Sequence, residues 1–501
     1  MFNLNFTESC ADTDLNVLLL GEKEELPAIY KNIDDESGGI ISKALSDDKI
    51  FDGKFAKTKT LSYIYKNSLR YILIVGLGSV SNLEKHKIES LGGKIYSLAN
   101  CLRVKKLAVD ARYHLKNFEK SEIGALIASG AKLASYRFDK YRTNLKDEDK
   151  SCLETFNVIV QDVSCANKCY SELEALISGI FLARDVISAP GNVLYPESYA
   201  RIIKDELTSV GAVVKILGES EMRELGMGAL LGVGQGSAKE SKLVVIEYFG
   251  SSDSDDKPIA FVGKGVTFDT GGICIKPSAG MWEMKYDMAG SAAVVGVMKA
   301  LAIRRANVNA IGVVGLVENM PGGNAQRPGD VVKTMSGKTV EVIDTDAEGR
   351  LVLSDALWYT QDKYKPQFMV DLATLTGAIV VALGNSYAGC FSNNEDLSDR
   401  LLAAGKKTDE KLWPMPLHQD YEDMIKSDIA DIANLGNVRG AAGSSTAAQF
   451  LKHFVNDIAW AHLDIAGMAW DKKGSNICPK GAVGFGIKLL NQLVKDHYET
   501  N

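Results

Sequence analysis

PIAFVGKGVTF, residues 258–268, and NAIGVVGLVE, residues 309–318, decide the fold class of this sequence. Both stretches are almost continuous apolar runs of strand length, and the helix-length segment AGSAAVVGVMKAL, residues 289–301, separates them. Strands without polar alternation are typical of a parallel sheet that is covered on both faces. A helix between two such strands joins them as parallel neighbours. The two stretches therefore predict an open α/β sheet.

Further strand-like runs extend this pattern on both sides. In the C-terminal part they are KLVVIEYF (242–249), TVEVID (339–344), FMVDLATLTGA (368–378) and WAHLDIAG (460–467). In the N-terminal part they are NVLLL (16–20), YILIVGLG (71–78), KLAVDA (106–111) and NVIV (157–160). Alternation of such runs with helical segments predicts a small N-terminal α/β domain and a larger C-terminal α/β domain with a mainly parallel sheet flanked by helices.

A long helical pattern lies between these two regions. Residues 171–190, SELEALISGIFLARDVISAP, place apolar residues at helical spacing, and Pro190 and Gly191 mark the end of the pattern. We therefore expect an N-terminal domain at 1–166, a linking helix at 167–190 and a C-terminal catalytic domain at 191–501.

Composition and charge are those of a globular enzyme. The 501 residues, 46% of them apolar, are enough for two or more domains with substantial cores. The net charge of -7 gives no general attraction for nucleic acid or anionic lipid. The N-terminus lacks a basic region followed by an apolar run, and no stretch approaches the roughly 18 apolar residues of a membrane span. We expect a cytoplasmic protein without a membrane segment.

Charged residues gather where the predicted strands end. Ligand sites of open α/β sheets lie at the carboxyl ends of strands, and Asp269, Asp346 and Thr374 follow such runs. Four carboxylates and three cations belong to this group: Asp269, Asp287, Asp346, Glu348, Lys264, Lys276 and Arg350. Carboxylates crowded beside a buried sheet would repel one another and lose hydration. A divalent cation would remove both costs.

The residue types indicate which metals such a site would hold. Carboxylate oxygens suit magnesium, manganese and zinc, and bridging carboxylates can hold two ions about 3.5–4 Å apart. The six histidines form no HExxH pattern, so a histidine-based zinc site is not predicted. Taken singly, Asp346 and Glu348 could instead cap a helix, and Arg350 could pair with them. Together the seven residues predict a two-metal hydrolase.

These motifs resemble those of the leucyl aminopeptidase family, cytosolic aminopeptidases with a dinuclear metal centre. The family signature is usually written NTDAEGRL, and residues 344–351 read DTDAEGRL, with Asp344 at the place of Asn. The block from Gly263 to Asp287, the segment DLATLTGA and the segment NVLYP at 192–196 also match. The resemblance extends from about Leu182 to Gly486.

The resemblance implies a role for each charged residue. One metal would be held by Lys264, Asp269, Asp287 and Glu348, and the other by Asp269, Glu348 and Asp346, which also offers its backbone carbonyl. Lys276 would stabilise the oxyanion, and Arg350 would hold a bicarbonate ion that acts as general base. Lysine binds a metal only as the neutral amine, so its ordinary pKa of about 10.4 must fall, as a neighbouring dication would make it do.

The same resemblance implies the activity and its cofactors. The protein would use two divalent ions per subunit, manganese or zinc, with magnesium or cobalt as alternatives. It would remove N-terminal residues, preferably Leu, Met and other apolar residues, from peptides. Family members are hexamers. The pocket for the first substrate residue would be lined by Met284, Thr374, Leu375, Gly377 and Ala466.

Two other functions stay open from the sequence. Some bacterial relatives bind DNA in addition to cleaving peptides, which the acidic net charge does not support here. The carboxylates alone would also serve a phosphoesterase, although the two lysines and the order TDAEGRL favour a peptidase. The Gly- and Ser-rich segment at 434–451 is expected to be a loop near the active site or an interface.

Overall fold

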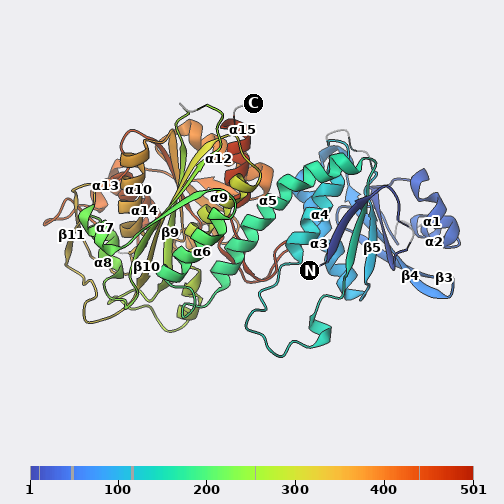
Figure 1. Ribbon diagram of the computed structural model, residues 1–501, viewed down its shortest axis with the longest axis horizontal. Helices are drawn as coiled ribbons and strands as arrows, with labels where there is room; N and C mark the ends of the chain where they lie inside the picture. Colours follow the sequence, from blue (N-terminus) through green and yellow to red (C-terminus); the bar gives the residue numbers. More distant parts are fainter. Residues whose placement is uncertain are drawn as a thin grey trace. The chain divides into compact units, whose positions relative to one another are not determined.

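The computed structural model describes residues 2–10, 12–46, 50–113, 115, 118–253, 256–438 and 440–499. The chain divides into two compact units. The smaller comprises Met1–Ile177 and Lys473–Pro479, and the larger comprises Ser178–Lys472 and Lys480–Asn501. Each unit contains its own sheet with helices packed against it (Figure 1). The predicted α/β class, with a smaller N-terminal and a larger C-terminal part, is confirmed.

The smaller unit is built on a six-stranded sheet in the order β1-β6-β5-β2-β4-β3. All neighbours are parallel except β3, which is antiparallel to β4. Its elements are β1 (Asn3–Thr7), β2 (Leu15–Gly21), η1 (Ala28–Tyr30), α1 (Lys31–Glu36), α2 (Ile40–Leu45), β3 (Thr58–Tyr65), β4 (Ser68–Gly78), η2 (Val80–Asn82), α3 (Lys85–Cys101), β5 (Lys106–Asp110), α4 (Glu122–Ala134), η3 (Asp147–Asp149) and β6 (Thr155–Ile159). The helix predicted between the two regions is α5 (Val163–Ser188), which begins earlier than its apolar pattern indicates.

The larger unit is built on an eight-stranded sheet in the order β15-β14-β17-β13-β9-β10-β8-β7. Its elements up to β13 are α6 (Pro196–Thr208), β7 (Val213–Leu217), α7 (Glu219–Glu224), α8 (Gly228–Gly234), β8 (Lys242–Phe249), β9 (Ile259–Asp269), η4 (Met281–Tyr286), α9 (Ala289–Ile303), β10 (Asn309–Asn319), β11 (Val331–Lys333), β12 (Thr339–Glu341), α10 (Gly349–Tyr364) and β13 (Phe368–Ala373). The later elements are α11 (Gly377–Leu383), β14 (Ala388–Ser392), α12 (Glu395–Thr408), β15 (Leu412–Pro414), α13 (Gln419–Met424), β16 (Ile432–Ala433), α14 (Gly443–Lys452), β17 (Ala459–Asp464), β18 (Trp470–Asp471), β19 (Gly481–Ala482) and α15 (Ile487–His497).

The centre of this sheet is parallel, as its apolar strands predict. Strands β17, β13, β9 and β10 are parallel neighbours. Antiparallel pairs occur on both sides of them, where β14 joins β17 and where β8 joins β10 and β7. The carboxyl ends of four parallel strands therefore meet at one edge.

One predicted strand belongs elsewhere. The run TVEVID at 339–344 forms β12 over Thr339–Glu341 only, and β12 pairs with β11 and β16 in a separate three-stranded sheet. Residues 342–348 then connect this small sheet to α10. The expectation that Asp346 follows a strand of the main sheet is therefore wrong, because the run before it pairs with β11 and β16, and a strand of three residues has too little sequence pattern to indicate its partners.

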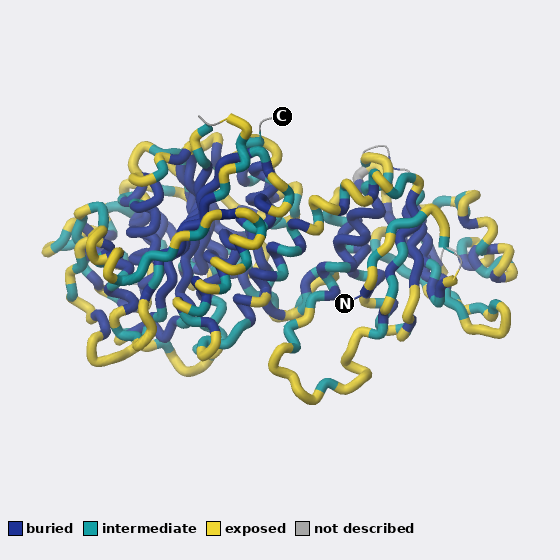
Figure 2. Tube along the Cα trace, in the orientation of Figure 1, coloured by how far each residue is buried: buried dark blue, intermediate teal, exposed yellow. Residues whose placement is uncertain are grey.

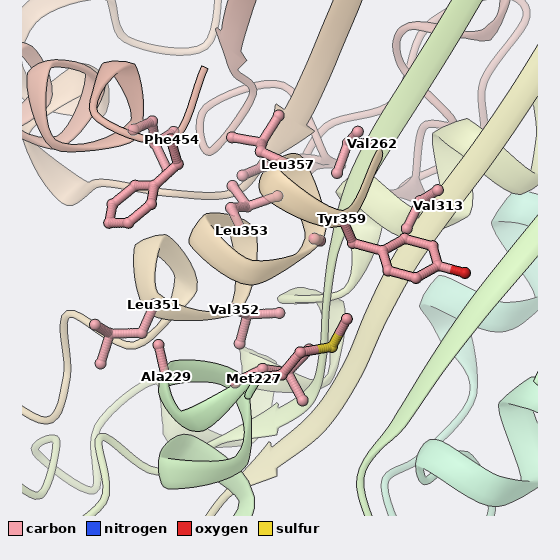
Figure 3. Packing of buried hydrophobic residues seen from close by; sticks show 14 of the residues in the cluster. Met227, Ala229, Val262, Val313, Leu351, Val352, Leu353, Leu357, Tyr359 and Phe454 are labelled. Atoms are coloured by element: carbon pink, nitrogen blue, oxygen red, sulfur yellow. The ribbon is translucent and has the colours of Figure 1, made fainter. Parts of the chain in front are cut away.

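The core of the larger unit explains why its strands are apolar on both faces. In Figure 1, α8, α10 and α14 lie on one side of β9 and β10, whereas α6 and α9 lie on the other. Val262 and Val313 pack with Leu353 and Leu357 of α10 (Figure 3). Residues of the opposite phase face α9. Figure 2 shows the strands of this sheet as buried along most of their length.

One helical stretch in the described residues has the length and composition of a membrane span but is mostly buried. Residues Met281–Ile303 have the length and the mean hydropathy, 1.3, of a possible span, but 83% of the apolar window is buried within the protein. The stretch combines η4 with α9, which packs against β9 and β10. Its small residues allow this close packing: a Cβ atom at Gly290 would lie 2.0 Å from the carbonyl oxygen of Leu372.

Candidate metal centre

The candidate centre begins on β9, where Lys264 and Asp269 reach the same group of charges. In a regular strand, residues an odd number of positions apart point to opposite faces. The pairing of β9 with β10 shifts register between Val317 and Glu318, which leaves Thr267 as an extra residue. Such a bulge re-aims the side chains beyond it. Lys264 and Asp269 can therefore both serve one site.

Lys264 is buried, and oxygen atoms surround its amine. Its Nζ atom lies 2.9 Å from Oδ1 of Asp287, 2.8 Å from Oε1 of Glu348 and 2.9 Å from the carbonyl oxygen of Thr374. Glu348 precedes α10, but among the described residues its side chain makes no capping hydrogen bond. Gly349 permits the approach, because a Cβ atom there would lie 2.6 Å from Cε of Lys264.

Lys276 joins two more of the predicted carboxylates. Its Nζ atom lies 2.7 Å from Oδ2 of Asp269 and 2.5 Å from Oδ1 of Asp346. Its backbone N–H donates to the carbonyl of Thr270, which holds the loop after β9. One oxygen each of Asp269, Asp346 and Glu348 lies within 4.8 Å of the others. The structure thus brings together both lysines and all four carboxylates predicted from the sequence.

Asp287 lies between η4 and α9 and is held by Thr374. The Thr374 hydroxyl donates to Oδ1 of Asp287 at 2.7 Å and to its carbonyl at 3.1 Å. Oδ2 of Asp287 lies 2.8 Å from Nζ of Lys264, yet it accepts no hydrogen bond of good geometry from the described part of the chain. A buried oxygen of this kind is available to a cation.

Burial and mutual repulsion raise the pKa of the carboxylates. Burial, with repulsion from Glu348 and Asp269, raises the pKa of Asp287 to about 8 despite the attraction of Lys264. Burial and then Asp269 raise the pKa of Asp346 to about 6. The pKa of Glu348 is raised for the same two reasons. These carboxylates therefore favour any ligand that brings positive charge.

The two lysines supply that charge in the absence of a metal. Burial would lower the pKa of Lys264 and of Lys276, but the surrounding carboxylates outweigh burial, and both pKa values lie above the ordinary one. A divalent cation bound by the same carboxylates would neutralise their charge and repel the Lys264 ammonium. Both effects would lower the pKa of Lys264 and favour the neutral amine.

Arg350 lies in the first turn of α10 and is buried. Its Nη1 atom donates to the carbonyl of Asn434 at 2.8 Å, whereas its Nε has no hydrogen-bond partner among the described residues. Burial lowers the pKa of Arg350 to about 10, against the attraction of Glu348 and Asp464. The guanidinium therefore stays charged at neutral pH and has a donor to offer an anion.

The side chain of Asn434 holds the DTDAEGRL loop. It donates to the carbonyl of Asp344 at 2.7 Å and accepts from the backbone N–H of Ile343 at 2.7 Å. Asp344 in turn accepts from the backbone N–H of Asp346 at 2.9 Å. The departure from the usual Asn at 344 is thus accommodated by a local turn, since either side chain can accept this bond.

The segment 434–451 is a loop only in its first part. Helix α14 begins at Gly443, because Ala447, Ala448, Phe450 and Leu451 form a buried helical face there. Arg439 of this segment lies outside the described residues.

Hydrogen bonds connect the residues predicted to line the substrate pocket. Thr374 and Leu375 lie on the connection from β13 to α11, and Gly377, which is exposed, is the first residue of α11. Oδ1 of Asp464 accepts from the backbone N–H groups of Leu375 and Ala466, both at 3.2 Å. The carbonyl of Met284 accepts from the N–H of Asp287, which is bonded to Thr374.

Four polar residues that support these groups were not singled out from the sequence: Asn319, Thr345, Asn434 and Asp464. Asn319 donates to Oδ1 of Asp269 at 2.8 Å. The Thr345 hydroxyl donates to the carbonyl of Gly271. Asn319 ends β10 and Asp464 ends β17. The rule that ligand sites lie at the carboxyl ends of strands would have selected both.

The donor set fits hard divalent cations. Four carboxylates converge, and one of their buried oxygens accepts no hydrogen bond from the described residues. The amine of Lys276 forms ion pairs with carboxylates, and the amine of Lys264 forms ion pairs and also donates to a carbonyl. Oxygen donors of this kind suit magnesium and manganese. The residues present therefore fit a metal centre.

Comparison with known proteins gives a consistent result. Residues 181–491 match the catalytic domain of the cytosol aminopeptidase family, and residues 17–145 match its N-terminal domain. A "Probable cytosol aminopeptidase" of Rickettsia bellii (strain OSU 85-389) is 52% identical over 502 residues, covering 100% of both chains. One of Rickettsia felis is 50% identical over 500 residues, covering 99% of this chain and 100% of that protein.

A solved structure has the same fold. The "Bottromycin maturation enzyme BotP in complex with Mn" aligns with a TM-score of 0.83 and 29% sequence identity, covering 96% of this chain and 99% of that one.

Proposed function

The chain belongs to the cytosol aminopeptidase family of metallo-exopeptidases, and from this premise we propose that it uses two divalent ions to release N-terminal residues from peptides. The proposed preference is for Leu, Met and other apolar residues. The observation that carries the proposal is the convergence of two lysines and four carboxylates from separate segments of the chain on one edge of the sheet.

We assign the metal-holding residues within this cluster. Lys264, Asp269, Asp287 and Glu348 would hold one ion, and Asp269, Asp346 and Glu348 the other, so Asp269 and Glu348 would be shared. Manganese or zinc are the proposed ions, and the manganese complex of the similar solved enzyme supports the former. When bound, two such ions would lower the pKa of a water molecule and polarise the peptide carbonyl.

Lys276 is proposed as the residue that stabilises negative charge on the reacting carbonyl. Without metal, Asp269 and the other carboxylates outweigh burial and hold its pKa above the ordinary value. The ordinary lysine pKa of about 10.4 already keeps such an amine charged at neutral pH. A cation held in place before the reaction stabilises a developing oxyanion without reorganisation.

Arg350 is proposed to hold a bicarbonate ion, which would supply a general base. The buried Nε atom, which lacks a partner among the described residues, supports an anion at this position. The Asn434 carbonyl keeps the guanidinium in place through Nη1.

The substrate's first side chain is proposed to lie against Met284, Thr374, Leu375, Gly377 and Ala466. Leu375 and Ala466 pack against buried apolar residues of the larger unit. These apolar surroundings support an apolar first residue in the substrate. None of these five residues carries a charged side chain, which supports the proposed preference for Leu and Met.

The proposal is tested by removing metals with a chelator and assaying leucine p-nitroanilide before and after Mn²⁺ or Zn²⁺ is added. Activity should return with metal. A folded protein that binds metal but cleaves no aminoacyl substrate would contradict the proposal, and phosphoesters would then be assayed. A salt-dependent gel shift would test DNA binding separately.

The remaining features are proposed from the family. We propose a homohexamer, a cytoplasmic location and domains at 1–166 and 191–501 joined by the helix of 167–190. Sedimentation of the purified protein would test the oligomeric state.

A further inference from the structure

We infer that Asn319 is a positioning residue of the proposed metal centre: its side-chain amide fixes the carboxylate of Asp269 against the DTDAEGRL loop. This inference rests on the proposed function. Asn319 is the last residue of β10 and stands opposite Asp269, the last residue of β9, in the parallel ladder. Its side chain is buried, with 4% of the residue exposed.

The amide of Asn319 joins two segments that both supply proposed ligands. Its Nδ2 atom donates to Oδ1 of Asp269 at 2.8 Å and to the carbonyl of Thr345 at 3.0 Å. Thr345 directly precedes Asp346. The two hydrogens of one amide therefore fix the distance between Asp269 and the loop that carries Asp346 and Glu348.

The orientation of this amide is determined by its neighbours. Both partners at Nδ2 are acceptors only, so a flipped amide would place its oxygen against a carboxylate and a carbonyl. On the other side, Oδ1 lies where Gly272 leaves room, because a Cβ atom at Gly272 would come within 2.8 Å of it. Gly272 has a φ of 67°, which other residues rarely adopt.

Asn319 also decides which oxygen of Asp269 is available. Oδ1 of Asp269 accepts from Asn319 and from the backbone N–H of Gly271 at 2.9 Å, so it is already bonded twice. Oδ2 faces Lys276 at 2.7 Å. Hydrogen bonds thus hold the Asp269 carboxylate at Oδ1, and Oδ2 faces the proposed metal centre. Loss of such support typically weakens metal binding about 10- to 100-fold.

The backbone of Asn319 fixes the same turn. Its carbonyl accepts from the backbone N–H of Thr270 at 3.0 Å and from the Thr270 hydroxyl at 2.8 Å. A substitution of the Asn319 side chain leaves these backbone bonds in place. The contribution of the side-chain amide to metal binding can therefore be measured without disrupting the turn after β9.

Strand β10 offers a matched control at its other end. Asn309, the first residue of β10, is also buried, donates to the carbonyl of Asp256 at 3.0 Å and accepts from the N–H of Ser251 at 3.2 Å. Asn309→Ala therefore removes comparable bonds from the same strand without touching the proposed centre.

The test is calorimetric titration of Mn²⁺ into the metal-free full-length protein, together with thermal unfolding of each variant. Asn319→Ala should lower the affinity about 10- to 100-fold, and Asn309→Ala should leave it unchanged. Asn319→Asp keeps the shape but replaces a donor by an acceptor beside Asp269. It should also lower the affinity, although it adds negative charge.

Three results would overturn the inference. They are wild-type affinity in folded Asn319→Ala, a higher affinity in Asn319→Asp, and an equal loss in Asn309→Ala. If Asn319→Ala does not fold, Asn319→Asp decides. A wild-type protein that binds Mn²⁺ and cleaves leucine p-nitroanilide retains the proposed function even then. A wild-type protein that binds no divalent ion would overturn both.

Discussion

The Nζ atom of Lys264, on β9, lies 2.8 Å from Oε1 of Glu348, at the start of α10. This ion pair connects two stretches of sequence, residues 258–268 and 344–351, that carry most of the charged residues predicted to form the site. Both groups are buried, and an isolated charge in such a place would be costly. The pair is stable as ammonium and carboxylate, whereas a metal ligand must be an amine. Proton loss should therefore accompany metal binding.

Metal binding should release protons, and the apparent affinity should rise with pH. Asp287 and the other carboxylates raise the pKa of Lys264 above its ordinary value, so the amine carries a proton at pH 7 without metal. Lys264 must lose this proton to become a ligand. Titration of Mn²⁺ in buffers of different protonation enthalpy between pH 6 and 9 measures this release. Binding without proton release would contradict the proposed role of Lys264.

Neutralising Glu348 should remove metal from the centre. Glu348→Gln keeps the size but halves the available carboxylate oxygens and lowers the charge, so the bound metal per chain should fall. Asp355→Asn is the matched control, because Asp355 is also buried on α10 but bonds the backbone N–H groups of Leu230 and Met335. Metal content by mass spectrometry distinguishes the two. Equal metal content in Glu348→Gln and wild type would exclude Glu348 as a ligand.

Lys276→Ala should lose activity but keep metal. Removal of a charge that stabilises the oxyanion should lower kcat about 10²- to 10³-fold. Asp269 and Asp346 lose a competing cation at the same time, so metal affinity should stay equal or increase. Lys299→Ala, which breaks an ion pair with Glu206, is the control with unchanged kcat. Retained kcat in Lys276→Ala would refute the assignment.

Asp355 should make stability depend on pH. Burial raises the pKa of Asp355 from 3.8 to about 7 against its backbone hydrogen bonds. The folded chain then holds this proton where the unfolded chain has lost it, so the contribution to stability is complete below about pH 4 and disappears as the pH rises through 7.

Asp355→Asn should lower the melting temperature, because one backbone N–H loses its acceptor, at a cost of about 1–3 kcal/mol. The difference in melting temperature between wild type and variant should shrink from pH 5 to pH 8. A difference that grows with pH would show that the backbone donors outweigh burial.

The parts of this fold that follow from apolar pattern were predictable. Strands β9 and β10 and the charges around them could be placed from the sequence, because continuous apolar runs end at those residues. The bulge at Thr267 could not be predicted, since its local sequence contains no signal for an extra residue. The sheet that contains β12 was not predicted, because the three residues of β12 have too little sequence pattern to indicate which strands they pair with.

The charged residues of the site were recognisable, but their supports were not. Lys264 and Glu348 stand out as charges among Gly and Ala. Asn319 and Asn434 are ordinary polar residues, and their importance depends on which carbonyl or carboxylate lies beside them. Only the folded chain shows that one amide joins Asp269 to Thr345.

The central claim is that these carboxylates and lysines form a two-metal peptidase centre. The most direct measurement returns Mn²⁺ stepwise to metal-free protein and follows bound metal per chain and leucine p-nitroanilide hydrolysis in the same samples. We expect two ions per chain and activity that rises as they bind. Full activity in the metal-free protein, or two bound ions without any hydrolysis, would contradict the claim.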